Sequence, residues 1–73
     1  MQNVRKHISK ALTETLRVGS AINKEVCDLS YAKYNGEVSE TEYEWRYSCL
    51  KAEHDNAMRV AECLKEALAR IPA

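Results

Sequence analysis

The sequence predicts an all-α fold: an antiparallel helical hairpin of two long helices that dimerises into a four-helix bundle. Apolar residues recur at spacings of three and four in both halves of the chain, which is the period of an amphipathic helix. One break, Asn35-Gly36, separates the halves, and no proline occurs before Pro72. The 73 residues are expected to form a single domain, whose core is small for its surface.

The first helix is expected over about residues 3–34. Its apolar positions share one helical face, on which Thr15 fills one slot. Leu12 and Leu16 widen this stripe past the contact with a single partner helix. The positions on the main face are Val4, Ile8, Ala11, Val18, Ile22, Val26 and Leu29.

The turn is expected over residues 35–38. Asparagine and glycine tolerate the left-handed backbone conformation that closes the last turn of a helix, so Asn35-Gly36 is typical of a helix end. Ser39 and Glu42 match the capping box, in which the serine oxygen accepts a backbone N–H and the glutamate reaches back to the cap residue. The break is therefore predicted to be a helix–loop–helix turn.

The second helix is expected over about residues 39–71, before Pro72 ends it. A short loop between two long helices gives an antiparallel hairpin. Folding at the turn places His54 beside Val18 and Gly19, and we expect the glycine to leave room for the imidazole. The face that meets the first helix carries Tyr43, Tyr47, Leu50, His54, Ala57, Ala61, Leu64, Leu68 and Ile71.

A second apolar row on the last helix predicts self-association, because one partner helix cannot cover both rows and monomers seldom expose a long apolar patch. Residues 1–36 carry six Lys/Arg and three Asp/Glu, whereas residues 37–73 carry five and eight. The two halves should therefore attract each other. Head-to-tail packing of two hairpins is favoured by a different asymmetry, because it sets the acidic turn end against the basic open end. The turn end carries Asp28, Glu37, Glu40, Glu42 and Glu44, and the open end carries Arg5, Lys6, His7, Lys10, Lys65 and Arg70. The predicted dimer interface consists of Leu12, Leu16, Cys49, Ala52, Val60 and Cys63.

The cysteines indicate a reducing compartment. Cys27, Cys49 and Cys63 are odd in number and have no CxxC spacing, so they do not predict a disulfide framework, and we expect them to be small core residues. The N-terminal residues lack the apolar run of a secretory signal, and no stretch approaches a membrane span. The expected location is the cytoplasm, of a bacterium or of an infected host, without a membrane partner.

The turn and its flanks carry a resemblance. The segment NGEVSETEYEW, residues 35–45, resembles the glycine, aliphatic, Ser/Thr and Glu-aromatic pattern that joins helices in short bacterial oligomerisation hairpins. The layout of the whole chain is similar to that of the plasmid-encoded Rop dimer. The likeness supports the hairpin, but a shared layout does not carry a function.

The aromatic residues all lie within seventeen positions around the turn. Binding hot spots favour Trp, Tyr and Arg, which cover a large area and offer a polar group, so this end of the molecule is a candidate protein-binding site. The alternative is that these side chains only close the end of the hairpin core. The candidate residues are Tyr31, Tyr34, Tyr43, Trp45, Arg46 and Tyr47.

A basic cluster at the start of the first helix is a candidate anion-binding site. Arg5, Lys6 and Lys10 lie where the helix dipole disfavours cations, and they would suit phosphates or an acidic protein surface. The alternative is a solvated helix end. Because the formal net charge is zero and no aromatics interleave with the cluster, the indication of nucleic-acid binding is weak.

The sequence contains no catalytic constellation and predicts no cofactor or metal. An active site between subunits would draw on His54, Arg17 and Glu53, but no motif spacing fixes these residues together. His54 is expected to fix the helix register instead. For zinc, the hairpin brings together at most His7 and Cys63, which is short of the four ligands of a structural site.

The prediction is therefore a small non-enzymatic protein-binding module of the phage-encoded or accessory regulator type. Its partners would be a second copy of itself and a larger host or regulatory protein, whose activity it modulates or inhibits. The alternative is Rop-like binding of nucleic acid or a nucleotide through the basic face of the first helix.

Overall fold

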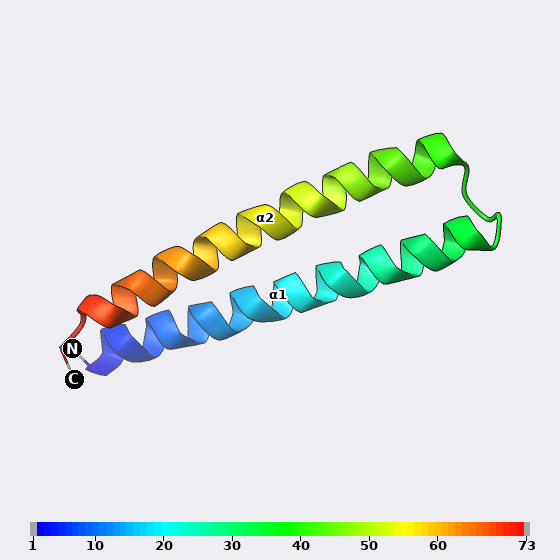
Figure 1. The fold of residues 1–73 in the computed structure, drawn as a ribbon. Helices are drawn as coiled ribbons and strands as arrows, with labels where there is room; N and C mark the ends of the chain where they lie inside the picture. Colours follow the sequence, from blue (N-terminus) through cyan, green and yellow to red (C-terminus); the bar gives the residue numbers. More distant parts are fainter. Residues whose placement is uncertain (1, 73) are drawn as a thin grey trace.

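The computed structural model describes residues 2–72, with side chains from residue 3. It contains two helices, α1 (Gln2–Tyr34) and α2 (Glu40–Arg70), and the described residues form no strand. Figure 1 shows that the helices run antiparallel, with the start of α1 and the end of α2 at one end and the connecting turn at the other. The molecule is a rod of 53 × 14 × 12 Å. The predicted all-helical hairpin is confirmed.

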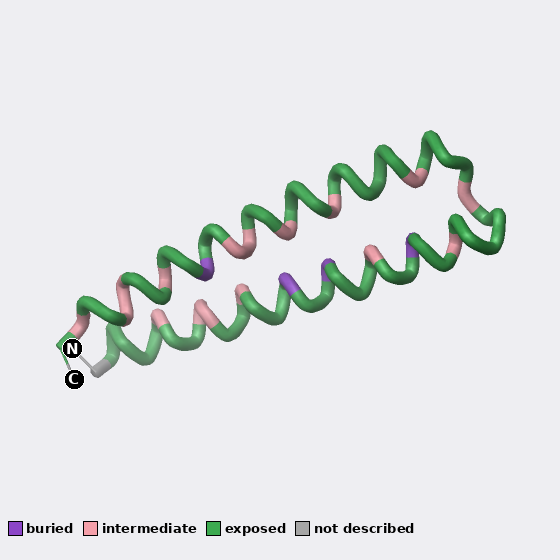
Figure 2. The backbone as a smooth tube through the Cα atoms, viewed as in Figure 1, coloured by how far each residue is buried: buried purple, intermediate pink, exposed green. Residues whose placement is uncertain are grey.

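The core is one narrow seam between the helices. Figure 2 shows the buried and half-buried positions on the sides where α1 and α2 face each other, and the outer sides are exposed. The buried hydrophobic residues are Ile22, Leu29 and Ala61, and Ala61 retains 2% exposure. Along α1 the seam runs at alternating spacings of four and three, through Ile8, Leu12, Thr15, Gly19, Ile22, Val26 and Leu29. This alternation is the heptad pattern of a coiled coil.

The seam corrects two predictions for the first helix. Val18, which we expected in the core, is 52% exposed, and Val4 also lies outside the core. Gly19 is buried in its place, and Leu12 is half-buried in the seam. The prediction chose Val18 because it is apolar. The seam spacing of four after Thr15 instead selects residue 19, and a glycine there gives no apolar signal of its burial.

The register also differs from the prediction. A Cβ added at Gly19 would meet Met58 Cε at 2.6 Å, so Met58 packs over the glycine where we expected His54. The partner of Gly19 thus lies one helical turn further along α2.

The end of α1 has the hydrogen bonds of a Schellman motif. Gly36 adopts φ 76° and donates its N–H to the carbonyl of Lys33 at 3.0 Å. The N–H of Glu37 donates to the carbonyl of Ala32 at 2.8 Å. Because an L-residue with a side chain rarely adopts this conformation, glycine is the residue that allows α1 to close here.

The start of α2 forms half of the expected capping box. Ser39 Oγ accepts a hydrogen bond from the N–H of Glu42 at 3.1 Å. In a complete capping box the Glu42 carboxylate would accept the N–H of the cap residue. Here it points the other way along the helix and lies 3.6 Å from Arg46 Nε, one turn further along. Both charged groups are about half exposed, so this ion pair contributes little to stability.

Candidate protein-binding surfaces

The aromatic residues near the turn contribute to three surfaces, of which the first two adjoin at Val26. On the first, the rings of Tyr43 and Tyr47 stack with their centroids 5.9 Å apart and their planes at 22°. The Nζ atom of Lys33 lies 4.3 Å from the centroid of the Tyr43 ring, which places the cation over the ring face. Because Tyr43 is half-buried and Lys33 comes from α1, this cluster holds the two helices together at the turn end.

The second surface belongs to α1 alone. Tyr31 is 71% exposed and Tyr34 is 90% exposed. Together with Val26, Cys27 and Ser30 they line a shallow groove of about 410 Å³. No residue of α2 lines this groove, so its two rings contribute nothing to the hairpin seam and remain open to another molecule.

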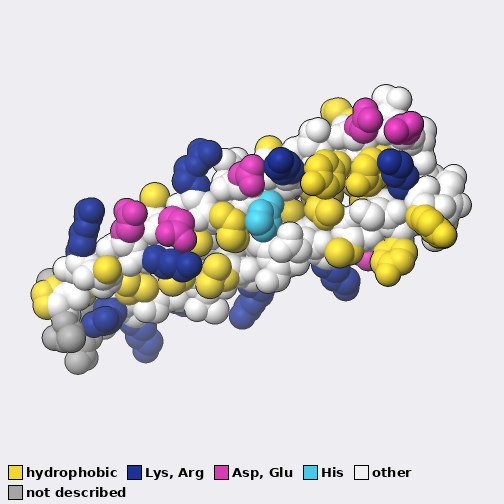
Figure 3. Space-filling model, in the orientation of Figure 1, with side chains coloured by type: hydrophobic (Ala, Val, Ile, Leu, Met, Phe, Trp, Pro, Cys, Tyr) yellow, Lys and Arg dark blue, Asp and Glu magenta, His cyan; other side chains and the backbone are white. Residues whose placement is uncertain are grey.

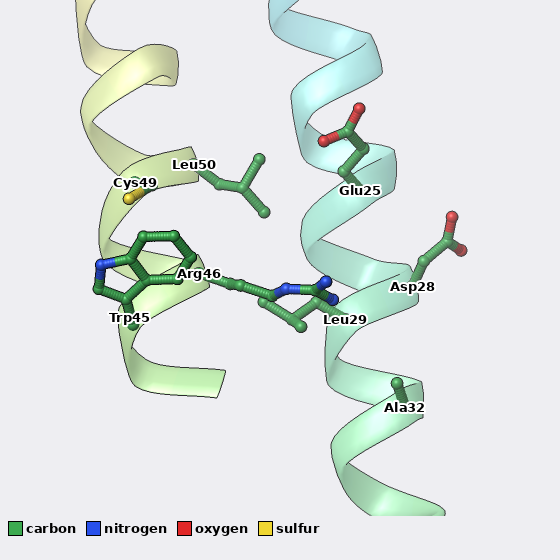
Figure 4. A pocket seen from close by; sticks show the side chains of 8 residues that line it. All are labelled: Glu25, Asp28, Leu29, Ala32, Trp45, Arg46, Cys49 and Leu50. Carbon is green, nitrogen blue, oxygen red and sulfur yellow. The ribbon is translucent and has the colours of Figure 1, made fainter. Parts of the chain in front are cut away.

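The third surface is a groove of about 470 Å³ between the helices, near the turn. Figure 4 shows Arg46 reaching from α2 towards Leu29 on α1, while Trp45 lies along the outside of α2 beside Cys49. Trp45 is 68% exposed. The structure therefore brings Trp45 together with Arg46, Tyr31 with Tyr34, and Tyr43 with Tyr47, but it does not gather all six candidate residues on one surface.

A row of exposed residues continues along α2 from Trp45. We call it the outer row, and it includes Asn56, a polar position that a search for apolar periodicity passes over. The expectation that the cysteines are core residues is wrong for the hairpin, because Cys27, Cys49 and Cys63 are all exposed. The outer row consists of Trp45, Cys49, Ala52, Asn56, Val60 and Cys63.

Of the two α1 residues of the predicted dimer interface, Leu16 lies on the other side of the seam from the outer row. Leu16 comes two turns before Asn23 and so shares its helix face. Asn23 lines a groove of about 230 Å³ with His54, whereas Cys49 lines the groove around Trp45. One flat interface therefore covers either Leu16 or the outer row. Leu12 is half-buried against the seam.

His54 is half-buried at the edge of the seam. The other residues around its groove are Asn23, Val26, Tyr47, Lys51 and Asp55. Arg17 and Glu53 are exposed and do not line this groove. Within the described residues, no three His, Cys, Asp or Glu side chains lie close enough together to hold a metal ion.

The basic cluster extends into solvent at the start of α1. Arg5, Lys6 and Lys10 are exposed, and in the part of the chain that the structure describes no carboxylate pairs with them. Figure 3 shows Lys and Arg side chains along the whole length of this face, including the open end, with hydrophobic side chains between them. Over the described residues, neither α1 nor α2 contains a segment of the length and apolarity needed to cross a membrane.

Comparison of the chain with protein-family models, with curated proteins and with solved structures gives no match.

Proposed function

We propose that the chain is a small non-enzymatic protein-binding module: a homodimeric hairpin that forms a four-helix bundle and docks on another protein to modulate its activity. One observation supports this proposal above others. Among the described residues, the hairpin buries only three hydrophobic residues and exposes eight large ones, and small domains with so small a core are commonly stabilised by self-association. The exposed residues are Val4, Leu16, Val18, Tyr31, Tyr34, Trp45, Tyr47 and Val60.

The surface that we assign to the second protein is the α1 groove of Tyr31 and Tyr34. Both rings are exposed, rigid and amphipathic, which are the properties of hot-spot side chains. They lie apart from the outer row of α2, so docking there leaves the outer row free. Arg46, whose Nε atom lies 3.6 Å from Glu42, is less suited to a partner because that carboxylate already faces it.

The test is an affinity capture from the native host with a matched variant. The wild-type chain is expected to retain a protein that binds it saturably after purification. Tyr31→Ala/Tyr34→Ala is expected to weaken that binding by at least about thirtyfold, the loss that marks one hot spot. Ser20→Ala, an exposed change elsewhere on α1, is the control and should bind as the wild type does. Equal retention of every protein by the wild type and the double variant would refute the assignment.

The second candidate function is binding of nucleic acid or a nucleotide by Arg5, Lys6 and Lys10. It is favoured by the exposure of these three side chains without a carboxylate partner among the described residues. It predicts a gel shift at low salt that weakens as salt rises and that Lys6→Gln/Lys10→Gln removes. If RNA and DNA are not shifted, and nucleotides leave the melting temperature unchanged, this function is excluded.

A further inference from the structure

We infer that the homodimer forms through the outer row of α2, with the two α2 helices antiparallel and Asn56 on the two-fold axis. This inference rests on the dimerisation part of the proposed function, but not on docking to another protein. It places Cys49 of one protomer opposite Cys63 of the partner subunit.

The geometry starts from a line of five exposed residues on α2. They are spaced by seven positions, which is about two helical turns. In a helix that packs with a heptad pattern, residues at this spacing lie on the same side of the helix, one above the other. The line reaches from near the first residue of α2 to its last. Its members are Glu42, Cys49, Asn56, Cys63 and Arg70.

This line is symmetric about Asn56 in the sense that an antiparallel dimer requires. Cys49 and Cys63 each lie about 10.5 Å along the helix from Asn56, at the standard rise per residue. A second α2 running the other way therefore places a thiol opposite a thiol at both positions. It also places Asn56 opposite its own copy, where each amide can donate to and accept from the other. A single polar residue of this kind fixes the register of paired helices.

Charge selects the antiparallel arrangement over the parallel one. In the antiparallel dimer, Glu42 lies opposite the partner's Arg70 at both ends of the contact, in addition to the Arg46 of its own chain at 3.6 Å. In a parallel dimer each of these residues would lie opposite its own copy, so that like charges meet. Complementary charges fix the orientation of an interface even where each pair adds little affinity.

The outer row also has the shape that close helix packing needs. Cys49, Ala52 and Cys63 are small and let two helix backbones approach, while Trp45 and Val60 add apolar area beside them. The rod is 53 Å long and 14 × 12 Å across. Two outer rows packed along α2 would make a contact as long as this 31-residue helix, about 46 Å at the standard rise per residue.

The opposite side of the hairpin is less suited to a second copy. Leu16 is exposed there, but the residues at seven-position spacing on the same line are Ser9, Asn23 and Ser30. None of the residues on this line is charged, so it has no counterpart of Glu42 and Arg70 to set the orientation of two copies. The outer row is therefore the surface that we assign to the dimer.

The test uses two single-cysteine variants of the full chain. Cys27→Ser/Cys63→Ser keeps only Cys49, and Cys27→Ser/Cys49→Ser keeps only Cys63. Each is oxidised with diamide, alone and after the two have been unfolded and refolded together. In each cross-link two thiols lose two protons and two electrons, which reduce diamide to the hydrazine, and one disulfide forms.

The expected result is a disulfide-linked dimer in the mixture and almost none in either variant alone. Copies of Cys49 would lie about 21 Å apart along antiparallel helices, beyond the reach of a disulfide. Thiols that lie opposite each other have millimolar effective concentrations, so we expect the linked fraction of the mixture to exceed that of either variant by at least about tenfold. As a second measurement, Asn56→Cys in a chain with all three cysteines replaced by Ser should cross-link with itself.

Three results would overturn the inference. Efficient cross-linking of each single-cysteine variant with itself would show a parallel dimer. A dimeric mass in sedimentation without preferential cross-linking in the mixture would show that the copies meet through another surface. A monomeric mass would instead remove the dimer on which the inference rests, which distinguishes failure of the proposed function from failure of this register.

Discussion

Met58 packs directly over Gly19, so closely that a Cβ at position 19 would lie 2.6 Å from Met58 Cε. The residue approached is the flexible end of a methionine, which can move aside. The contact gives a buried glycine a structural reason in the middle of a 33-residue helix, where glycine costs about 1 kcal/mol relative to alanine. It also fixes the register of α1 against α2.

The Gly19–Met58 contact predicts energetic coupling between these positions. Met58→Ala removes the side chain that covers the glycine, and Gly19→Ala adds a methyl group into the same space. The double variant should therefore be more stable than the sum of the single changes implies, by about 0.5–1 kcal/mol. Urea unfolding of the four proteins measures the coupling. Strict additivity would mean that the two residues do not touch.

Gly36→Ala should destabilise the hairpin by about 1 kcal/mol, because alanine has to adopt the left-handed conformation at φ 76°. Nothing lies within 4 Å of a Cβ at this position, so the cost comes from the backbone alone. Gly36→Asn should cost less, since asparagine tolerates this region. Equal unfolding midpoints for the wild type and Gly36→Ala would contradict the observed turn.

Ser39→Ala should cost about 1 kcal/mol, because it removes the oxygen that accepts the Glu42 N–H at the start of α2. Ser48→Ala is the matched control, since Ser48 is exposed within α2 and caps no helix end. Its effect should stay within about 0.5 kcal/mol. A similar loss of helicity and stability in both variants would show that Ser39 has no capping role.

Leu29→Ala should destabilise the protein by about 2–4 kcal/mol, because it removes one of the most buried side chains of the seam. Tyr31→Ala, two residues later and on the exposed side of the same helix, should leave the unfolding free energy nearly unchanged. Chemical denaturation followed by circular dichroism compares the two. If Tyr31→Ala proved equally destabilising, Tyr31 would belong to the fold and could not serve as a free docking residue.

The helix ends and the hairpin were predictable because their signals are local. Gly36 and Ser39 each satisfy a backbone group within a few residues, and the three-four spacing sets the helical period. Local signals do not show which residues of a wide apolar face enter the seam. Val18 and Gly19 are neighbours, and the choice between them depends on the partner helix.

The arrangement of the candidate sites depends on this register and on helix rotation, which the sequence does not state directly. The aromatic residues are close along the chain, yet Tyr31 and Trp45 belong to different surfaces because they lie on different helices and neither faces the seam. The cysteines are exposed for the same reason, because the rotation of each helix turns them away from the seam. Only the seam of the folded hairpin shows which small residues remain outside it.

Sedimentation equilibrium of the wild-type chain, over a wide range of concentrations, tests self-association most directly. A hairpin with this much exposed apolar surface is expected to have a mass of twice the 8.3 kDa chain, with dissociation only on dilution. A mass of 8.3 kDa at every concentration, including the highest, would contradict the account.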